Sequence, residues 1–188
     1  MKLLYHASPI PHLTELTPHV SNHGKPLVYL SDRRESVLVY LSNPVERHCK
    51  RTGFPHEGPF YKFASYGFSP EGLPVLEEYY PEAFADTFAG IPGWIYRAES
   101  GDCTPFEGIP GAFVSETPVK VAGREFVPDA YEAILQAEKE GLVLLRRYQS
   151  HSPEKLRWIG DMVKKEYQNA AKYPNYQDFL QAKFPHLL

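Results

Sequence analysis

The chain has 188 residues with a formal net charge of −3, and 43% of its residues are hydrophobic. This length and apolar fraction suit one domain, with or without a helical appendage, while the thinly spread Lys and Arg give no support to a nucleic-acid-binding footprint, so no nucleic-acid partner is expected. The sequence contains neither the apolar run of a signal peptide nor a stretch long enough to span a membrane, so we expect a cytoplasmic protein without membrane partners.

The first predicted elements are a strand at 3–8 and a strand-turn-helix unit at 27–42. The second segment begins as an apolar strand and turns at Ser31 and Asp32 into a helix. Asp32 is a favourable N-cap, and Glu35 stands three residues later, where a capping box places its acidic partner. We therefore expect a helix that begins directly after this strand.

The rest of the chain adds further strands and then a helical C-terminal region. Strands are predicted at 60–64, 93–98, 112–116, 125–127 and 142–145. Helices are predicted in two pieces within 73–89, at 129–140, at 152–172, and in a last short segment capped by Asn175. The composition changes near Tyr148, so we expect an α+β fold with a core at 1–148 and a helical extension, 149–188, packed on that core.

Three features in chain order combine residue types that can perform chemistry. His6 lies on the first strand within Leu-Tyr-His-Ala-Ser, and Glu116 ends a later strand within Phe-Val-Ser-Glu. Tyr29 and Tyr40 are eleven positions apart on the strand-turn-helix unit, which can place their rings on opposite walls of a slot for a planar, electron-poor ring. Ser31 lies in the turn between the two tyrosines and is a further candidate for cofactor binding.

These features, in this order, resemble the His-Tyr-Glu branch of the ADP-ribosyltransferase superfamily, which includes diphtheria-type toxins and poly-ADP-ribose polymerases. The resemblance covers about residues 3–147 and implies a split two-sheet core with surrounding helices. It also implies NAD as the substrate, with His6 at the adenosine-side ribose. Tyr29 and Tyr40 would then flank nicotinamide, and Glu116 would be catalytic.

The chemistry of NAD explains why such residue types would be needed. Aromatic faces attract the cationic pyridinium ring by roughly 0.5–2 kcal/mol. Departure of nicotinamide gives the ribose oxocarbenium character, which a nearby carboxylate stabilises. The chain departs from the family pattern at two positions. Ala7 follows His6 where glycine is common, and Val114 stands two positions before Glu116 where many relatives have Glu or Gln, which disfavours transfer to arginine.

Each candidate residue also has a plain structural explanation. The tyrosines can be core aromatics, His6 a half-buried strand histidine, and Glu116 an exposed carboxylate. Three glutamates on neighbouring segments remain open as the catalytic residue: Glu99, Glu107 and Glu125.

Histidine and cysteine spacing predicts no metal site. The loop after the first strand contains three histidines, His12, His19 and His23, but Pro18 and Gly24 interrupt any helix that could align them. Cys49 and Cys103 are far apart in the sequence, and we expect both to be reduced thiols.

The leading functional hypothesis is an NAD-dependent ADP-ribosyltransferase, or an NAD glycohydrolase if water is the acceptor. The loops at 44–59 and 99–111 are the candidates for acceptor binding. The alternative is a catalytically silent nucleotide- or protein-binding module of the same fold.

Two further hypotheses rest on other residues. An RNA 2′-phosphotransferase-like enzyme would grip phosphate through Arg33, Arg34, Arg47 and Arg51. An unrelated scaffold would dock a partner on a helical stripe formed by Leu156, Ile159, Val163 and Tyr167. Such a stripe more often packs on its own core.

Overall fold

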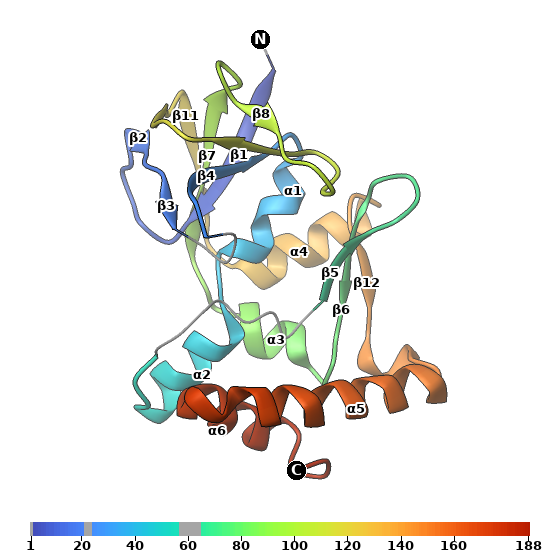
Figure 1. Ribbon diagram of the computed structural model, residues 1–188. Helices are drawn as coiled ribbons and strands as arrows, with labels where there is room; N and C mark the ends of the chain where they lie inside the picture. Colours follow the sequence, from blue (N-terminus) through green and yellow to red (C-terminus); the bar gives the residue numbers. More distant parts are fainter. Residues whose placement is uncertain (1, 21–23, 57–64) are drawn as a thin grey trace. The chain divides into compact units, whose positions relative to one another are not determined.

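The computed structural model describes residues 2–20, 24–56 and 65–188. It is a mixed α+β structure with antiparallel sheets, and the chain divides into two compact units (Figure 1). Unit 1 comprises residues 1–42, 67–75 and 88–144, and unit 2 comprises 43–66, 76–87 and 145–188. The helical region predicted at 149–188 therefore shares its unit with two segments from the middle of the chain.

Unit 1 is built on an antiparallel sheet in which the described strands follow the order β11-β7-β1-β4-β9-β8, with β3 also paired to β4. The bounds are Leu3–Ser8 for β1, His19–Val20 for β3, Pro26–Ser31 for β4, Gly93–Glu99 for β7, Thr104–Pro105 for β8, Ala112–Ser115 for β9 and Gly123–Val127 for β11. A separate two-stranded pair joins β2, Glu15–Leu16, to β10, Val119–Lys120.

The core of unit 1 includes a buried cluster on one face of this sheet. Its members on the central strands alternate along each strand, because neighbouring positions point to opposite faces. The cluster comprises Leu4, Leu16, Val28, Leu30, Tyr96, Ala98 and Val119. Ile95, which precedes Tyr96 on β7, is also fully buried, so the opposite face is covered as well.

The helices of unit 1 are short. Helix α1, Arg34–Val37, continues into a 3₁₀ turn, η1, Leu38–Tyr40. Helix α4, Ala130–Lys139, is the longest, and the side chain of Asp129 caps it by accepting from the amide nitrogen of Tyr131 at 2.8 Å. The sequence pattern therefore predicted α4 well, including Gly141 beyond its end, where a positive φ of 74° suits glycine.

The predicted cap of the first helix is wrong. Arg33 precedes α1, with no side-chain cap, and Asp32 is engaged elsewhere. The Asp32 carboxylate forms an ion pair with the ammonium group of Lys2 at 2.6 Å. The ammonium group of Lys2, which directly precedes β1, therefore replaces the local amide groups as the partner of this carboxylate, and α1 is short.

A third sheet has the order β12-β6-β5, with β5 at Ser65–Phe68, β6 at Pro74–Glu77 and β12 at Leu144–Arg146. The boundaries between the two units fall within all three strands. The first helical piece predicted within 73–89 is therefore wrong, because pairing with distant strands makes 74–77 extended. The strand predicted at 60–64 lies outside the described residues.

Unit 2 is mainly helical. Its helices are α2, Pro44–Thr52; α3, Ala83–Phe88; α5, Pro153–Asn169; and α6, Pro174–Lys183, with 3₁₀ turns η2 at Tyr148–Ser150 and η3 at Ala170–Lys172. Ser152 caps α5 as predicted, whereas Asn175 lies buried within α6 and does not cap it. Proline at the first position of α6 provides the helix start instead.

The apolar stripe predicted on the C-terminal helix packs on the core of unit 2. Ile159 and Val163 are buried in a cluster with residues of α2 and α6, and Leu156 and Tyr167 pack against it. The expectation that this stripe covers its own core is therefore confirmed. No helix of the described residues has the length and apolar character that a membrane crossing requires.

Candidate functional site

His6 lies where two strands of unit 1 pair only briefly. Strand β1 pairs with β7 through six consecutive residues, but its register with β4 contains the single pair Tyr5↔Ser31. Beyond that pair, the Nδ1 atom of His6 donates to the carbonyl oxygen of Tyr29 at 2.8 Å. The imidazole therefore takes the place of a ladder hydrogen bond.

This contact determines the tautomer of His6. A carbonyl oxygen can only accept, so Nδ1 carries the proton and Nε2 of the neutral ring is an acceptor. Burial lowers the pKa of His6; its hydrogen bond to Tyr29 raises the pKa and the charge of His19 lowers it further. A neutral ring with Nε2 as acceptor is thus favoured, whereas the family resemblance led us to expect a histidine that donates to ribose.

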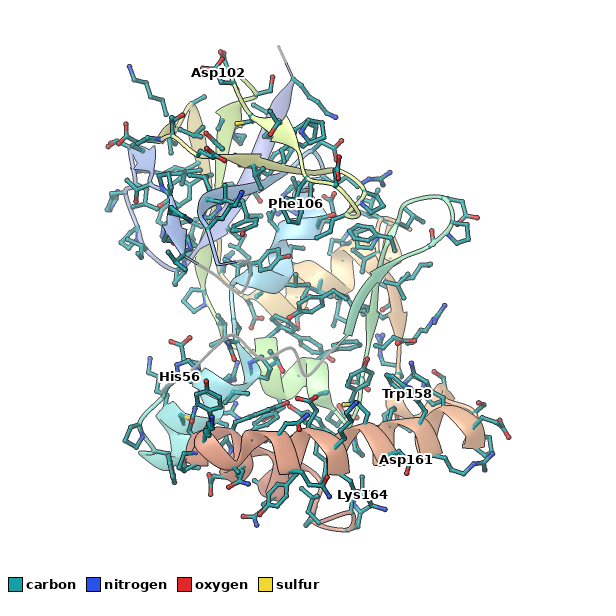
Figure 2. The ribbon with its side chains drawn as sticks, viewed as in Figure 1. His56, Asp102, Phe106, Trp158, Asp161 and Lys164 are labelled. Atoms are coloured by element: carbon teal, nitrogen blue, oxygen red, sulfur yellow. The ribbon has the colours of Figure 1, made fainter. Side chains whose placement is uncertain are left out.

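Tyr29 presents its ring to a loop aromatic. The ring of Phe106, which follows β8, meets the Tyr29 ring at a centroid distance of 5.9 Å and an interplanar angle of 80°, an edge-to-face contact. Figure 2 labels Phe106 on this loop. Sequence analysis named the loop at 99–111 but not Phe106, because a single aromatic in a Gly- and Pro-rich loop belongs to no periodic pattern.

Tyr40 ends η1 and is 50% exposed. Partial burial raises the pKa of its phenol, and the neighbouring phenol of Tyr29 raises it further. The two hydroxyl groups are therefore close enough to interact electrostatically. Both residues are partly exposed, because Tyr29 is only half-buried.

Ser31 has a local structural role. It is buried, and its hydroxyl oxygen accepts from the backbone nitrogen of Arg33 at 3.1 Å. This contact stabilises the turn between β4 and α1, as serine commonly does. The structure thus assigns the Ser31 hydroxyl to the internal hydrogen bonding of the turn.

Glu116 is exposed and follows the end of β9. Strand β9 pairs with β4 so that Val114 is opposite Tyr29 and Ser115 opposite Val28. Strand alternation would give Glu116 the same face as Tyr29, but the chain bends at this residue. The structure therefore brings His6, Tyr29 and Tyr40 together and places Glu116 at the end of the adjacent strand.

Of the other glutamates, Glu125 is already engaged. Its carboxylate accepts two hydrogen bonds from the guanidinium of Arg34, one of them from Nε at 3.0 Å. These bonds lower the pKa of Glu125 despite partial burial. Such a bidentate pair holds α1 to β11 and leaves Glu125 less suited to a catalytic role.

The described part of unit 1 also contains a hollow of about 500 Å³ lined by the segment 99–103, by Ser115 and by the segment 117–122. Glu99, Cys103 and Lys120 contribute to its wall, but none of the five predicted site residues does. The tyrosines and His6 thus belong to a different part of the unit.

The arginines proposed to grip phosphate are mostly engaged within the chain. Arg34 binds Glu125, Arg51 pairs with Asp86, and Arg47 donates to the carbonyl oxygen of Thr87 at 3.0 Å. These contacts weaken the RNA 2′-phosphotransferase hypothesis. Both cysteines are free thiols, and the described residues contain no group of three or more His, Cys, Asp or Glu that could hold a metal.

Known proteins give no further guidance to the site. Comparison of the chain with protein-family models, with curated proteins and with solved structures found no match. The assignment of a function therefore depends on the residues and contacts of this chain.

Proposed function

We propose that this protein is an NAD-dependent ADP-ribosyltransferase-like enzyme that cleaves the nicotinamide–ribose bond and transfers ADP-ribose to an acceptor or to water. The observation that carries the proposal is that Tyr29, which contacts Phe106 edge to face, and Tyr40, which interacts electrostatically with Tyr29, are both partly exposed. His6 stabilises the position of Tyr29, because its ring forms a hydrogen bond with the backbone carbonyl of Tyr29.

The aromatic residues would bind the charged end of the substrate. A pyridinium cation gains roughly 0.5–2 kcal/mol from an aromatic face, depending on desolvation. The edge of Phe106 against the Tyr29 ring restricts that ring before any ligand arrives. Preorganised rings bind more tightly because less conformational entropy is lost on association.

His6 and Glu116 would act on the sugars. In the neutral His6 ring, Nε2 would accept a hydrogen bond from a ribose hydroxyl, while the Tyr29 carbonyl keeps Nδ1 protonated. As the carbon–nitrogen bond breaks, its electron pair neutralises the pyridinium and positive charge passes to the ribose. The carboxylate of Glu116 would stabilise that charge, and water or an acceptor group would then attack the same carbon.

The catalytically silent binding module is the second candidate. The position of Glu116 favours it, because this carboxylate is exposed and follows a bend. An exposed carboxylate is screened by water, which reduces its effect on a nearby cation.

The release of nicotinamide from NAD, followed by liquid chromatography, tests the enzyme directly. Glu116→Gln keeps the shape of the side chain but removes its charge, and we expect the rate to fall by about 10²–10³. Glu132→Gln, at an exposed position of α4, is the matched control and should retain the wild-type rate. Equal rates for both variants would contradict the assignment of Glu116.

A binding measurement separates the two candidates. Tyr40→Ala should weaken NAD binding in calorimetry, whereas Tyr40→Phe should retain it, because the aromatic face remains. Binding that depends on Tyr40, without release of nicotinamide, would identify a silent module. NAD binding that is undetectable, or indifferent to Tyr40, would overturn both the enzyme and a nucleotide-binding module.

A further inference from the structure

A second group of aromatic and cationic side chains lies on strands β7 and β11 of the unit 1 sheet and on the loop that contains His12. Trp94 of β7 is its centre. The Phe126 ring lies 5.0 Å from the Trp94 ring, the His12 ring 5.9 Å, and the Arg124 guanidinium 5.3 Å, each measured to the centroid of Trp94. We name these four residues, with Ile10, the β11 patch.

The patch has exposed members, but its central residue packs on the core. Phe126 is 51% and Ile10 56% exposed, whereas Trp94 is half-buried and packs against the core of unit 1. Phe126 is directly opposite Trp94 in the pairing of β11 with β7. A cross-strand aromatic pair of this kind fixes both rings on one face of the sheet.

Buried Tyr96 holds the loop that presents His12. The Tyr96 hydroxyl donates to the carbonyl oxygen of Ile10 at 2.6 Å and accepts from the nitrogen of Leu13 at 3.2 Å. Between these two anchors, His12 has a positive φ of 61°, which is unfavourable for a residue with a side chain. Strain of this kind, held by the surrounding structure, is concentrated at functional sites.

The backbone beside the patch is available for pairing. Among the described strands, β11 is at the end of the sheet order and pairs only with β7. Its outer edge therefore presents amide and carbonyl groups that an extended polypeptide can pair with. Arg124 is exposed and has no carboxylate partner in the described part of the chain. Its guanidinium can therefore pair with an acidic group of a ligand bound at this edge.

We propose that β11 and its patch bind an extended segment of a partner protein, which adds as an antiparallel strand and places an apolar residue on Phe126 and an acidic residue on Arg124. The two patch residues are two positions apart and share a face. A segment antiparallel to β11 meets Phe126 first, so its sequence would be apolar-x-acidic from N- to C-terminus. The open edge favours a polypeptide over a nucleic acid, which cannot continue the hydrogen-bond ladder.

Two fluorescein-labelled peptides test this proposal on the full chain. Both carry Thr and Ser flanks, with Leu-Thr-Glu at the centre of one and Leu-Thr-Lys at the centre of the other. Fluorescence anisotropy should show at least tenfold tighter binding of the Glu peptide. Arg124→Glu should reverse that preference, because it makes the pair with the Lys peptide favourable.

The apolar contact and the location are tested separately. Phe126→Ser should weaken the binding of the Glu peptide about tenfold. Val20→Ser, at another exposed apolar position of unit 1, should leave this affinity unchanged. Amide resonances of residues 123–127 should shift when the Glu peptide is added. If Phe126→Ser does not fold, the peptide preference of Arg124→Glu still tests the proposal.

Three results would overturn the proposal. The first is equal affinity of the wild type for the two peptides, and the second is an unchanged preference in Arg124→Glu. The third is concentration-dependent self-association of the wild type that Phe126→Ser abolishes, because a second copy of the chain would then occupy this edge. None of these outcomes depends on NAD.

Discussion

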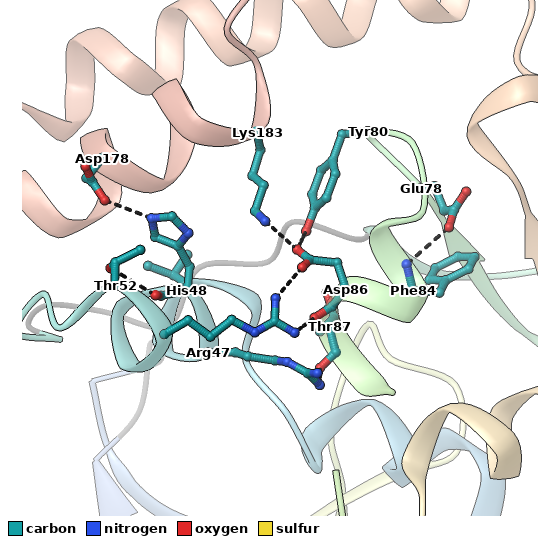
Figure 3. Close-up of polar contacts among 12 residues, drawn as sticks. Arg47, His48, Thr52, Glu78, Tyr80, Phe84, Asp86, Thr87, Asp178 and Lys183 are labelled. Carbon is teal, nitrogen blue, oxygen red and sulfur yellow. Dashed lines mark hydrogen bonds and ion pairs between the residues drawn. The ribbon is translucent and has the colours of Figure 1, made fainter. Parts of the chain in front are cut away.

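The two units use their charged groups differently. In unit 2, the Asp86 carboxylate joins the Tyr80 hydroxyl at 2.8 Å, Lys183 at 2.7 Å and Arg51 at 2.5 Å (Figure 3). These partners come from segments far apart in the sequence. In unit 1, by contrast, Glu125 binds the guanidinium of Arg34, and aromatic rings occupy the surface beside the strands.

This difference distinguishes polar groups that stabilise the fold from groups that can bind a ligand. Glu78 of unit 2 accepts from the nitrogen of Phe84 at 3.1 Å and from that of Tyr148 at 2.9 Å, so its carboxylate also serves the fold. Such groups have their hydrogen-bonding capacity filled within the chain. Both proposals concern unit 1 because it has partly exposed aromatic rings and because Arg124 has no carboxylate partner among the residues that the structure describes.

The largest effect on stability should come from Asp86→Ala. Burial alone would raise the pKa of Asp86, but hydrogen bonds from Lys183, Tyr80 and Arg51 outweigh it and lower the pKa. Removing the carboxylate leaves these donors without their acceptor. We expect a loss of about 3 kcal/mol in the free energy of unfolding, measured by urea denaturation.

The control for Asp86 is Glu154→Ala. Glu154 pairs with Arg157 at 3.1 Å, and both side chains are largely exposed. An exposed pair contributes at most about 1 kcal/mol, so this variant should differ little from the wild type. Equal losses for the two variants would show that the Asp86 network does not support unit 2.

A smaller loss, about 2 kcal/mol, is expected for Gly111→Ala in unit 1. Gly111 has a positive φ of 72°, and an added Cβ would collide with a carboxylate oxygen of Asp32. Gly90→Ala is a matched control, because Gly90 has φ of 71° and open space around it. Thermal unfolding should show a larger loss for Gly111→Ala, and equal losses would exclude crowding at Asp32 as the cause.

The smallest effect should be the pH dependence due to His6. Its folded-state pKa is lowered, so the unfolded chain binds more protons below pH 6.5. Its contribution to stability is therefore complete above about pH 6.5 and is lost as the pH falls through the folded-state value. The protection factors of the β7 amides, which correct for the intrinsic pH dependence of exchange, should fall between pH 7 and 5 in the wild type and less so in His6→Asn, which retains a donor for Tyr29.

Unit 2 should respond at lower pH. The pKa values of Asp86 and Glu77 are lowered, in both cases by bound cations that outweigh burial. Their contributions are complete above about pH 4 and are lost as the pH falls through the folded-state values. We therefore expect the amides of α6 to keep their protection from exchange between pH 7 and 5. If protonation of Asp86 removed that protection in this range, unit 2 would not be the unit that responds at lower pH.

Local patterns predicted much of the fold. Strands β1, β4, β7 and β9 and helices α4 and α5 occur close to their predicted positions, because each has a period or a cap that nearby residues determine. The prediction failed at 74–77 and at Asp32. A distant strand decides the first conformation, and Lys2 decides the partner of the second, so neither is visible in a short window.

The candidate site was predictable only in its parts. The spacing of Tyr29 and Tyr40 indicated that they share a surface, which their electrostatic interaction supports. Neither the hydrogen bond from His6 to the Tyr29 carbonyl nor the contact with Phe106 follows from spacing. Both depend on how β1 diverges from β4 and on how a loop folds back, which are properties of the assembled sheet.

The alternation of the chain between units has a consequence for synthesis on the ribosome. Val45 and Cys49 of α2 share a buried cluster with Phe179 and Phe184, which are translated more than a hundred residues later. At bacterial or eukaryotic elongation speeds this is a delay of roughly ten seconds. During most of that interval, only Tyr79, Tyr80 and Ala83 of the same cluster can cover α2, so its burial is completed only when α6 leaves the ribosome.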